Sequence, residues 1–400
     1  MSENRHWLLP EGIGETLPPQ AQLLEQLRRE LLDLYRSWGY ELIFPPFVEY
    51  LDSLLTGTGG DLDLQTFKLT DQITGRTLGI RADITPQAAR IDAHQLRRDC
   101  PTRLCYLGTV LNSRAVALSE SRSPLQIGAE LYGYSGVEAE LEILSLMIET
   151  LTRAGIDELY LDLGHVGIFR GLVRQAGLDK RQELALFDAL QRKAVPELES
   201  LVGEFSLSES LSEMTVRLAE LSGEGALEAA AVSLANAGTP VREALDELGR
   251  LAERLRQRHP DLPVHYDLAE LRGYHYHTGV VFAAFVPGIG QEVARGGRYD
   301  DIGHVFGRAR PACGFSADLT KLLKLGRIDL HPSPPAIFAG YDDDPLLRQQ
   351  IVNLRAAGRT VIEGLPEQQG DAARMGCGEE LRKLGGQWVI TGVPSDRQSR

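Results

Sequence analysis

Gln126 and Glu130 are the two polar side chains of the otherwise apolar run of residues 125–132. A second apolar run, residues 103–107, precedes it, and the polar segment 112–124 joins the two. We expect a pair of antiparallel strands. Because side chains alternate between the two faces of a strand, Gln126 and Glu130 point the same way. An amide and a carboxylate on one face can make charge-assisted hydrogen bonds to a polar ligand.

With its spacing kept, this strand pair resembles motif 2 of the class II aminoacyl-tRNA synthetases, most closely that of histidyl-tRNA synthetase. In that family the first strand ends in Phe-Arg-x-Glu, where the Arg grips the α-phosphate of ATP and the Glu orients the nucleotide. The matching positions in this chain are Leu111, Asn112, Ser113 and Arg114. Asn112 supplies no charge, and losing one such donor costs roughly 3 kcal/mol or more. Arg114 places a cation where an anion is expected. The alternative interpretation is that this segment is a variable surface hairpin and its alignment with motif 2 is wrong.

Three further segments resemble histidyl-tRNA synthetase. Residues 81–85 match its Arg-Pro-Glu-x-Thr block, with Asp83 in place of the Glu. Residues 271–278 resemble its histidine-specific signature, where an Arg neutralises ATP and an aromatic side chain lines the imidazole pocket. Residues 294–300 resemble the glycine-rich turn that walls the same pocket.

Residues 313–322 stand where motif 3 is expected, a strand that runs into a helix. The Arg that binds the γ-phosphate of ATP in the family corresponds to Lys321. A Lys is a point charge and cannot reproduce the planar fork of an Arg. Asn112, Arg114 and Lys321 are therefore three nucleotide-binding positions that depart from the family pattern.

The resemblance implies a histidine pocket made of Asp83, Thr85, Gln126, Glu130, Arg272 and Tyr276. In the resemblance, a carboxylate pair holds the ammonium, Arg272 the carboxylate, and Glu130 or Gln126 the imidazole N–H. His277 stands where the family has Tyr. The alternative is that each of the six is a hydrogen-bonded polar residue of a sheet core. His275 and His277 alternate along an expected strand, but two His without a third ligand are usually structural, so we expect no metal site.

The hydrophobic pattern predicts the elements that must position these residues. Residues 21–37 have leucines at helical spacing, and residues 41–50 read as a strand broken by two prolines. Together they resemble motif 1, the dimer interface of the class II family. A hairpin with a glycine turn is expected at residues 67–80. A helix follows, with Thr85 as its N-cap and Pro86 at its first position.

The predicted fold class is α+β, a class II synthetase-like core with an antiparallel sheet flanked by helices. We expect the core in two parts: residues 1–166, with motifs 1 and 2, and residues 263–328, with the histidine signature and the degenerate motif 3. Residues 167–262, rich in Leu, Ala and Glu, are expected to form a helical insertion. Residues 336–400 are expected to form a small C-terminal α/β domain.

Local patterns add detail to the second half of the chain. Strands are expected at residues 265–268 and 274–286. Residues 331–335, with three prolines, read as a stiff linker. In the C-terminal domain we expect parallel strands joined by helices near residues 344–357 and 378–384.

Composition is typical of a globular protein, with 43% hydrophobic and 24% charged residues in a chain of 400. No apolar run reaches the roughly 20 residues that span a bilayer, and the chain start lacks the apolar segment of a signal peptide, so we expect a cytoplasmic location and no membrane contact. The four cysteines form no Cys-x-x-Cys pair and are expected to be reduced. The net charge of −14 argues against broad nonspecific contact with polyanions, and we do not expect tRNA as a partner. The candidates for a local basic patch are Arg90, Arg97, Arg98 and Arg103.

The chain keeps the spacing of the synthetase motifs but lacks the residues that bind the nucleotide. In this combination it resembles one group of histidyl-tRNA synthetase relatives, the regulatory subunits of ATP phosphoribosyltransferase. The resemblance implies a chain that is not itself an enzyme and needs no cofactor. It implies assembly with a short catalytic subunit, which joins ATP to phosphoribosyl pyrophosphate in the first step of histidine biosynthesis. It also implies a dimer through the motif 1 region and L-histidine as the ligand for feedback inhibition. Two alternatives stay open: an active histidyl-tRNA synthetase with unusual motifs, and a tRNA-sensing module.

Overall fold

The computed structural model describes residues 8–56, 60–114, 121–274, 276–328, 334–368 and 370–393. The chain divides into two compact units, Met1–Ile328 and Asp329–Arg400. None of the helices in the described ranges is long and apolar enough to cross a bilayer.

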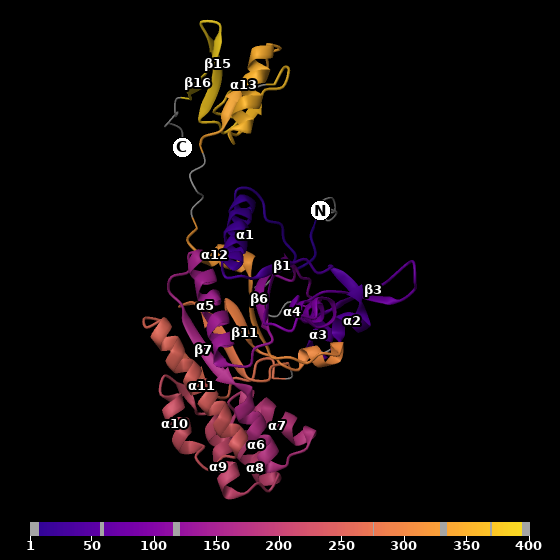
Figure 1. Ribbon diagram of the computed structural model, residues 1–400, viewed down its shortest axis with the longest axis vertical. Helices are drawn as coiled ribbons and strands as arrows, with labels where there is room; N and C mark the ends of the chain where they lie inside the picture. The colour runs from indigo at the N-terminus through magenta and orange to yellow at the C-terminus, as the bar shows by residue number, and fades with distance from the viewer. Residues whose placement is uncertain are drawn as a thin grey trace, which may run out of the picture. The chain divides into compact units, whose positions relative to one another are not determined.

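A nine-stranded sheet forms the centre of the unit Met1–Ile328 (Figure 1). The pairs β1–β5 and β7–β9 are parallel, and the other neighbouring strands are antiparallel. The predicted sheet of a class II synthetase-like core is therefore confirmed. In spatial order the strands are β1 (Glu41–Ile43), β5 (Thr102–Thr109), β6 (Leu125–Tyr132), β12 (Ala312–Asp318), β11 (Ala294–Arg298), β10 (Val280–Phe285), β7 (Tyr160–His165), β9 (Val264–Asp267) and β8 (Ser222–Gly223).

Three helices cover one face of this sheet. Helix α5 (Val137–Arg153) packs on β6, β11 and β12, while α1 (Gln20–Ser37) packs on α5 and α12 (Leu319–Leu325) (Figure 1). The leucines of α1 that recur at helical spacing are buried in the resulting core, namely Leu27, Leu31 and Leu34. Full burial of one Leu side chain contributes about 1.5–3 kcal/mol, so this face holds α1 against its neighbours.

The prolines of the motif 1 segment divide it between two sheets. Strand β1 lies at the edge of the large sheet, and after Pro45 and Pro46 the chain enters β2 (Val48–Tyr50). Strand β2 pairs with β4 (Thr77–Ile80), which also pairs with β3 (Phe67–Thr70), as the predicted hairpin requires. Helices α2 (Leu51–Leu55) and α3 (Gly60–Gln65) connect β2 to β3.

Six helices lie between β7 and β9, in the segment where helices were expected, and the short strand β8 interrupts them between α9 and α10. Asp179 caps one of them through hydrogen bonds from the backbone N–H groups of Arg181 and Gln182. The apolar faces of these helices share one continuous core with the sheet. The helices are α6 (Val166–Ala176), α7 (Lys180–Gln191), α8 (Val195–Glu204), α9 (Glu209–Leu218), α10 (Ala226–Ser233) and α11 (Thr239–Arg258).

Helix α4 (Thr85–Arg90) has Pro86 in its first turn, but Ile84 is the residue at its N-cap, so the predicted Thr85 cap is wrong. The backbone N–H of Thr85, which belongs to the first turn, donates instead to Asp83 Oδ1 at 3.1 Å. A π-helix, Ile91–Leu96, continues directly from α4.

The strand predicted from residue 274 begins only at Val280. The chain turns instead at Gly273, whose φ of +64° favours glycine and whose carbonyl accepts the N–H groups of Tyr276 and His277 at 2.7 and 2.8 Å. The predicted alternation of two His along a strand is therefore wrong, and His275 itself lies outside the described residues.

The described residues of the unit Asp329–Arg400 form a four-stranded sheet with the order β14-β13-β15-β16 and one helix, α13 (Pro345–Ala356). Strand β13 (Ile337–Ala339) is parallel to β14 (Val361–Glu363) and β15 (Glu379–Leu384), and β15 is antiparallel to β16 (Gln387–Gly392). This confirms a small α/β domain. The linker predicted before it lies partly outside the described residues, since 331–333 are among the undescribed positions.

The helix predicted near residues 378–384 is wrong, because this segment is β15. Gly385 and Gly386 both have positive φ, 59° and 82°, and form the two-residue turn of a hairpin with β16. Leu381 packs into the core of the unit. Hairpin pairing therefore overrides the helical propensity of a short run rich in Glu, Leu, Arg and Lys.

Candidate functional site

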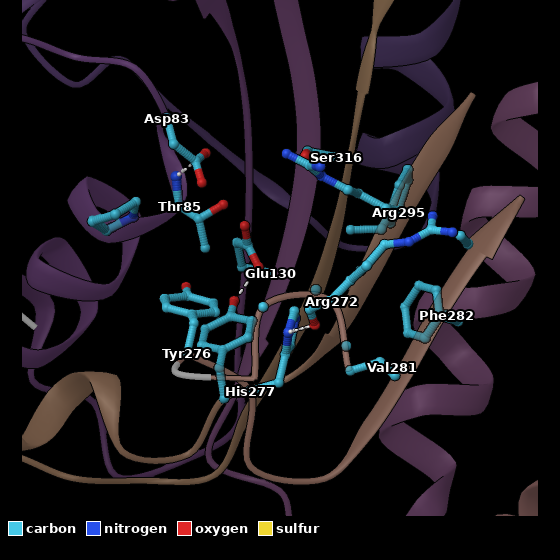
Figure 2. A pocket seen from close by; sticks show the side chains of 18 of the residues that line it. Asp83, Thr85, Glu130, Arg272, Tyr276, His277, Val281, Phe282, Arg295 and Ser316 are labelled. Atoms are coloured by element: carbon cyan, nitrogen blue, oxygen red, sulfur yellow. Dashed lines mark hydrogen bonds between the residues drawn. The ribbon is translucent and has the colours of Figure 1, made fainter. Parts of the chain in front are cut away.

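A cavity of about 300 Å³ opens on the sheet of the larger unit, with walls from β6, β10, β11 and β12. Its size lies at the lower end of the range for small-molecule sites, about 300–1,000 Å³. Five of the six predicted pocket residues line it, although they are far apart in the sequence: Asp83, Thr85, Glu130, Arg272 and Tyr276. Figure 2 shows Asp83, Thr85, Glu130 and Tyr276 to one side of the cavity and Arg272, Arg295 and Phe282 to the other.

Strand β6 separates the core from the cavity by the alternation of its side chains. Ile127 and Ala129 lie in the core that contains α1 and α5. Gln126 and Glu130 belong to the other face, as the even spacing predicts. Only Glu130 reaches the cavity lining.

Gln126 holds the acidic end of the cavity in place. Its Nε2 donates to Asp83 Oδ1 at 2.7 Å, and its Oε1 accepts the backbone N–H of Ile84 at 2.9 Å. Asp83 is therefore tied to both β6 and the first turn of α4. The Asp83 carboxylate lines the cavity, whereas Gln126 lies outside the lining and orients that carboxylate through its hydrogen bond.

Glu130 lies at the centre of a buried hydrogen-bond network. Its Oε1 accepts the hydroxyl of Tyr106 at 2.9 Å, and its Oε2 accepts the hydroxyl of Tyr299. Thr85 Oγ1 lies 3.0 Å from the Tyr106 hydroxyl and extends the network towards α4. Burial raises the pKa of Glu130 to about 8, although the two tyrosine hydrogen bonds favour the ionised form. The carboxyl is therefore largely protonated near neutral pH.

Glycine makes room for this network. A Cβ atom at Gly314 of β12 would lie 1.6 Å from Glu130 Oε2. A Cβ at Gly128 would lie 2.4 Å from the Tyr106 hydroxyl. Any larger residue would displace the Glu130 carboxyl that lines the cavity or the Tyr106 phenol that bonds to it.

Tyr276 supplies an unused polar group. Its ring stacks on that of Tyr299, with centroids 5.0 Å apart and an interplanar angle of 29°. Its hydroxyl is buried and has no hydrogen-bond partner among the described residues. A buried polar group without a partner costs free energy, so a ligand that bonds to it recovers that cost.

The basic end of the cavity is formed by Arg272. Its Nε lies 3.0 Å from Glu270 Oε2, and its Nη1 lies 2.5 Å from Glu292 Oε2. Arg295, also in the lining, lies 3.1 Å from Glu292 Oε1. Two guanidinium groups and two carboxylates therefore neutralise one another here.

His277 adds no charge to the cavity. Burial lowers its pKa to about 4, so the imidazole is neutral near pH 7. Its Nδ1 lies 3.3 Å from the Arg272 carbonyl, to which it can donate. Among the described residues, no group of three His, Cys, Asp or Glu side chains could hold a metal ion.

The three positions that depart from the nucleotide pattern lie outside the cavity lining. Asn112 is buried and forms an isolated bridge with Thr66, and its carbonyl accepts Arg122 Nε at 3.0 Å. Arg114 is exposed. Lys321 donates from Nζ to the carbonyl of Glu292 at 2.7 Å.

The candidate basic patch is largely neutralised by ion pairs. Arg90 lies 2.6 Å from Glu49, and Arg103 lies 2.6 Å from Glu142. Arg98 pairs with Glu41. A phosphate backbone would therefore meet guanidinium groups that already have carboxylate partners, which weakens the electrostatic gain on binding.

Four residues of the site were not identified from the sequence: Tyr106, Glu292, Arg295 and Tyr299. Tyr106 and Tyr299 lie inside or directly beside the motif segments, but their residue type alone did not single them out. Glu292 and Arg295 are near the β10–β11 turn, where no periodicity indicates direction.

Comparison with known proteins identifies the family of the chain. A sequence profile of the histidyl-tRNA synthetase family matches residues 12–322, and one described as the ATP phosphoribosyltransferase subunit HisZ C-terminal domain matches residues 334–391. A relative from Thioalkalivibrio sulfidiphilus named ATP phosphoribosyltransferase regulatory subunit is 55% identical, over 98% of this chain and 100% of its own length. One of the same name from Alkalilimnicola ehrlichii is 57% identical, over 97% and 98%.

Two solved structures are similar over most of the chain. A structure from Bacillus halodurans, described as an ATP phosphoribosyltransferase regulatory subunit/histidyl-tRNA synthetase, has a TM-score of 0.80 at 27% identity and covers 92% of this chain and 95% of its own. Histidyl-tRNA synthetase from Nostoc has a TM-score of 0.74 at 19% identity, over 96% and 97%, and shares the fold. The chain belongs to the family of ATP phosphoribosyltransferase regulatory subunits, built on the histidyl-tRNA synthetase fold.

Proposed function

We propose that this chain senses L-histidine for ATP phosphoribosyltransferase, the enzyme of the first step of histidine biosynthesis. As a non-catalytic regulatory subunit, it assembles with a short-form catalytic subunit, which needs it for activity and for inhibition by histidine. The observation that carries the proposal is that five of the six residues expected to bind an amino acid line one cavity. The three altered nucleotide-binding positions lie outside its lining.

The cavity offers a partner to each polar end of histidine. Asp83 is oriented for the ammonium, and Arg272 carries the positive charge for the carboxylate. Glu130 and the unpaired hydroxyl of Tyr276 are available to the imidazole. In this arrangement Gln126 orients Asp83 and makes no direct contact with the ligand.

Such a site regulates an enzyme only if histidine binds one state of the complex more tightly than another. A coupling free energy of about 1–3 kcal/mol is typical of allosteric proteins. The decisive experiment mixes the chain with a short-form catalytic subunit and follows formation of phosphoribosyl-ATP. We expect the chain to raise the rate and histidine to lower it. A rate that is indifferent to the chain would reject the assignment.

We also propose a dimer through the motif 1 region. Strand β1 is an edge of the large sheet; Leu42 within it is 41% exposed, and Phe44 directly after it is 75% exposed. An edge strand with apolar side chains suits a two-fold symmetric interface. Phe44→Glu should shift the protein to monomers in sedimentation velocity, and Val232→Glu on α10 serves as a control at another exposed apolar residue. An unchanged dimer in Phe44→Glu would reject this interface.

A cytoplasmic location is part of the same proposal, since it places the chain with a biosynthetic enzyme. Cell fractionation tests it directly, and recovery of the protein from the membrane fraction would contradict it.

A further inference from the structure

Glu292 is the point at which the basic end of the cavity is held together. It lies in the turn between β10 and β11, and its two carboxylate oxygens contact Arg272 at 2.5 Å and Arg295 at 3.1 Å. Its backbone carbonyl accepts Nζ of Lys321 at 2.7 Å. Three cationic side chains therefore meet one acidic residue that the proposed histidine site does not itself use.

The guanidinium of Arg272 has both of its edges engaged. Glu270 contacts Nε at 3.0 Å, and Glu292 contacts Nη1. An Arg binds a carboxylate most strongly through two parallel N–H bonds, which need a free edge. A ligand carboxylate can gain that geometry only if one of the two glutamates leaves.

Glu292 is the one free to leave. Glu270 is fixed by a second hydrogen bond, because its Oε1 accepts the backbone N–H of Arg272 at 2.7 Å, and its side chain is 16% exposed. The side chain of Glu292 is 26% exposed and already touches Arg295. It can turn onto Arg295 while Lys321 keeps its backbone in place.

We propose that Glu292 is an internal competitor for Arg272 and sets the affinity of the cavity for amino acids with a free carboxylate. The inference rests on the proposed histidine site and specifies what controls it. In the empty protein Glu292 neutralises Arg272, and histidine must displace it. Ligands without a carboxylate do not face this competition, so Glu292 narrows the affinity difference between histidine and its amino alcohol, histidinol.

Calorimetric titration of the full chain with histidine and with histidinol tests this directly. A partly exposed ion pair contributes up to about 1 kcal/mol, so Glu292→Gln should bind histidine up to about fivefold more tightly. Histidinol affinity should stay the same. Glu292→Ala should behave as Glu292→Gln does. Glu220→Gln removes a carboxylate partner of Arg217 outside the cavity lining and is the matched control. It should leave the affinity for histidine and the affinity for histidinol unchanged.

The outcomes separate this inference from the proposed site. Equal histidine affinity in the wild type and both Glu292 variants would overturn the competition while leaving the site intact. Weaker histidine binding in the variants would also overturn it, since Glu292 would then support the ligand. No binding of histidine to any of these proteins would overturn the site and the competition together.

Discussion

The buried carboxyl of Glu130 makes the stability of the larger unit depend on pH. Its pKa rises from an ordinary value of 4.5 to about 8 in the folded chain. A carboxyl whose folded pKa is raised binds its proton more tightly in the native state, so its contribution is fully present below about pH 4.5 and is lost as pH rises through about 8. At about 1.4 kcal/mol for each pKa unit, the loss across this window approaches 5 kcal/mol as an upper bound.

Glu130→Gln removes the titration and keeps a side chain of similar shape. Other buried carboxyls with raised pKa, such as Asp92 and Asp162, titrate in both proteins, so their contributions cancel in the difference. We expect the free energy of unfolding of the variant, relative to the wild type, to increase by several kcal/mol between pH 5 and pH 9.

Urea unfolding followed by tryptophan fluorescence measures this difference. Trp388→Phe is a suitable background, because it removes the tryptophan of the C-terminal unit and keeps Trp38, which packs against the core of the unit that contains Glu130. Parallel pH profiles for the two proteins would refute the reasoning, since they would mean that Glu130 is ionised in the folded chain at the same pH as in the unfolded chain.

Four further predictions concern the core and the cavity. Arg298→Met should lower the free energy of unfolding by about 3–5 kcal/mol, because Glu140 is fully buried against Arg298 and would be left unpaired; a loss below 1 kcal/mol in urea titration would contradict this. Gly296→Ala should lower the melting temperature sharply, because its Cβ would lie 2.1 Å from the Gly314 carbonyl, and a thermal melt like that of the wild type would exclude this clash. Asp83→Asn keeps the oxygen that accepts from Gln126 but removes the charge, so histidine affinity should fall roughly tenfold or more by calorimetry; full affinity would move the ammonium elsewhere. Lys321→Arg should show no histidine-dependent pyrophosphate exchange, as we also expect for the wild type, and robust exchange in either would indicate an active synthetase.

The sequence predicted the fold best where a periodic pattern coincides with a motif. The leucines of α1 and the strand pair β5–β6 were correctly placed, because burial enforces the periods of 3.6 and 2. Strand β15 was missed because its residues favour a helix in isolation, and only pairing with β13 and β16 makes them extended.

The sequence predicted which residues line the site better than it predicted which of them contact one another. Five of the six pocket residues lie around one cavity, although nothing in a one-dimensional pattern could show that Gln126 faces Asp83. Glu292 had no signal, because its importance comes from three cations that reach it from separate elements.

The order of strands in the large sheet has a consequence for how the chain folds as it leaves the ribosome. Strand β12, almost the last part of this unit to be synthesised, lies between β6 and β11 and supplies the Gly314 face against which Glu130 rests. Until it emerges, β6 has an open edge, whereas α6 to α11 can form from local contacts. The complete sheet and the cavity therefore form together, once β12 has been synthesised. A nascent chain that stops before β12 has neither.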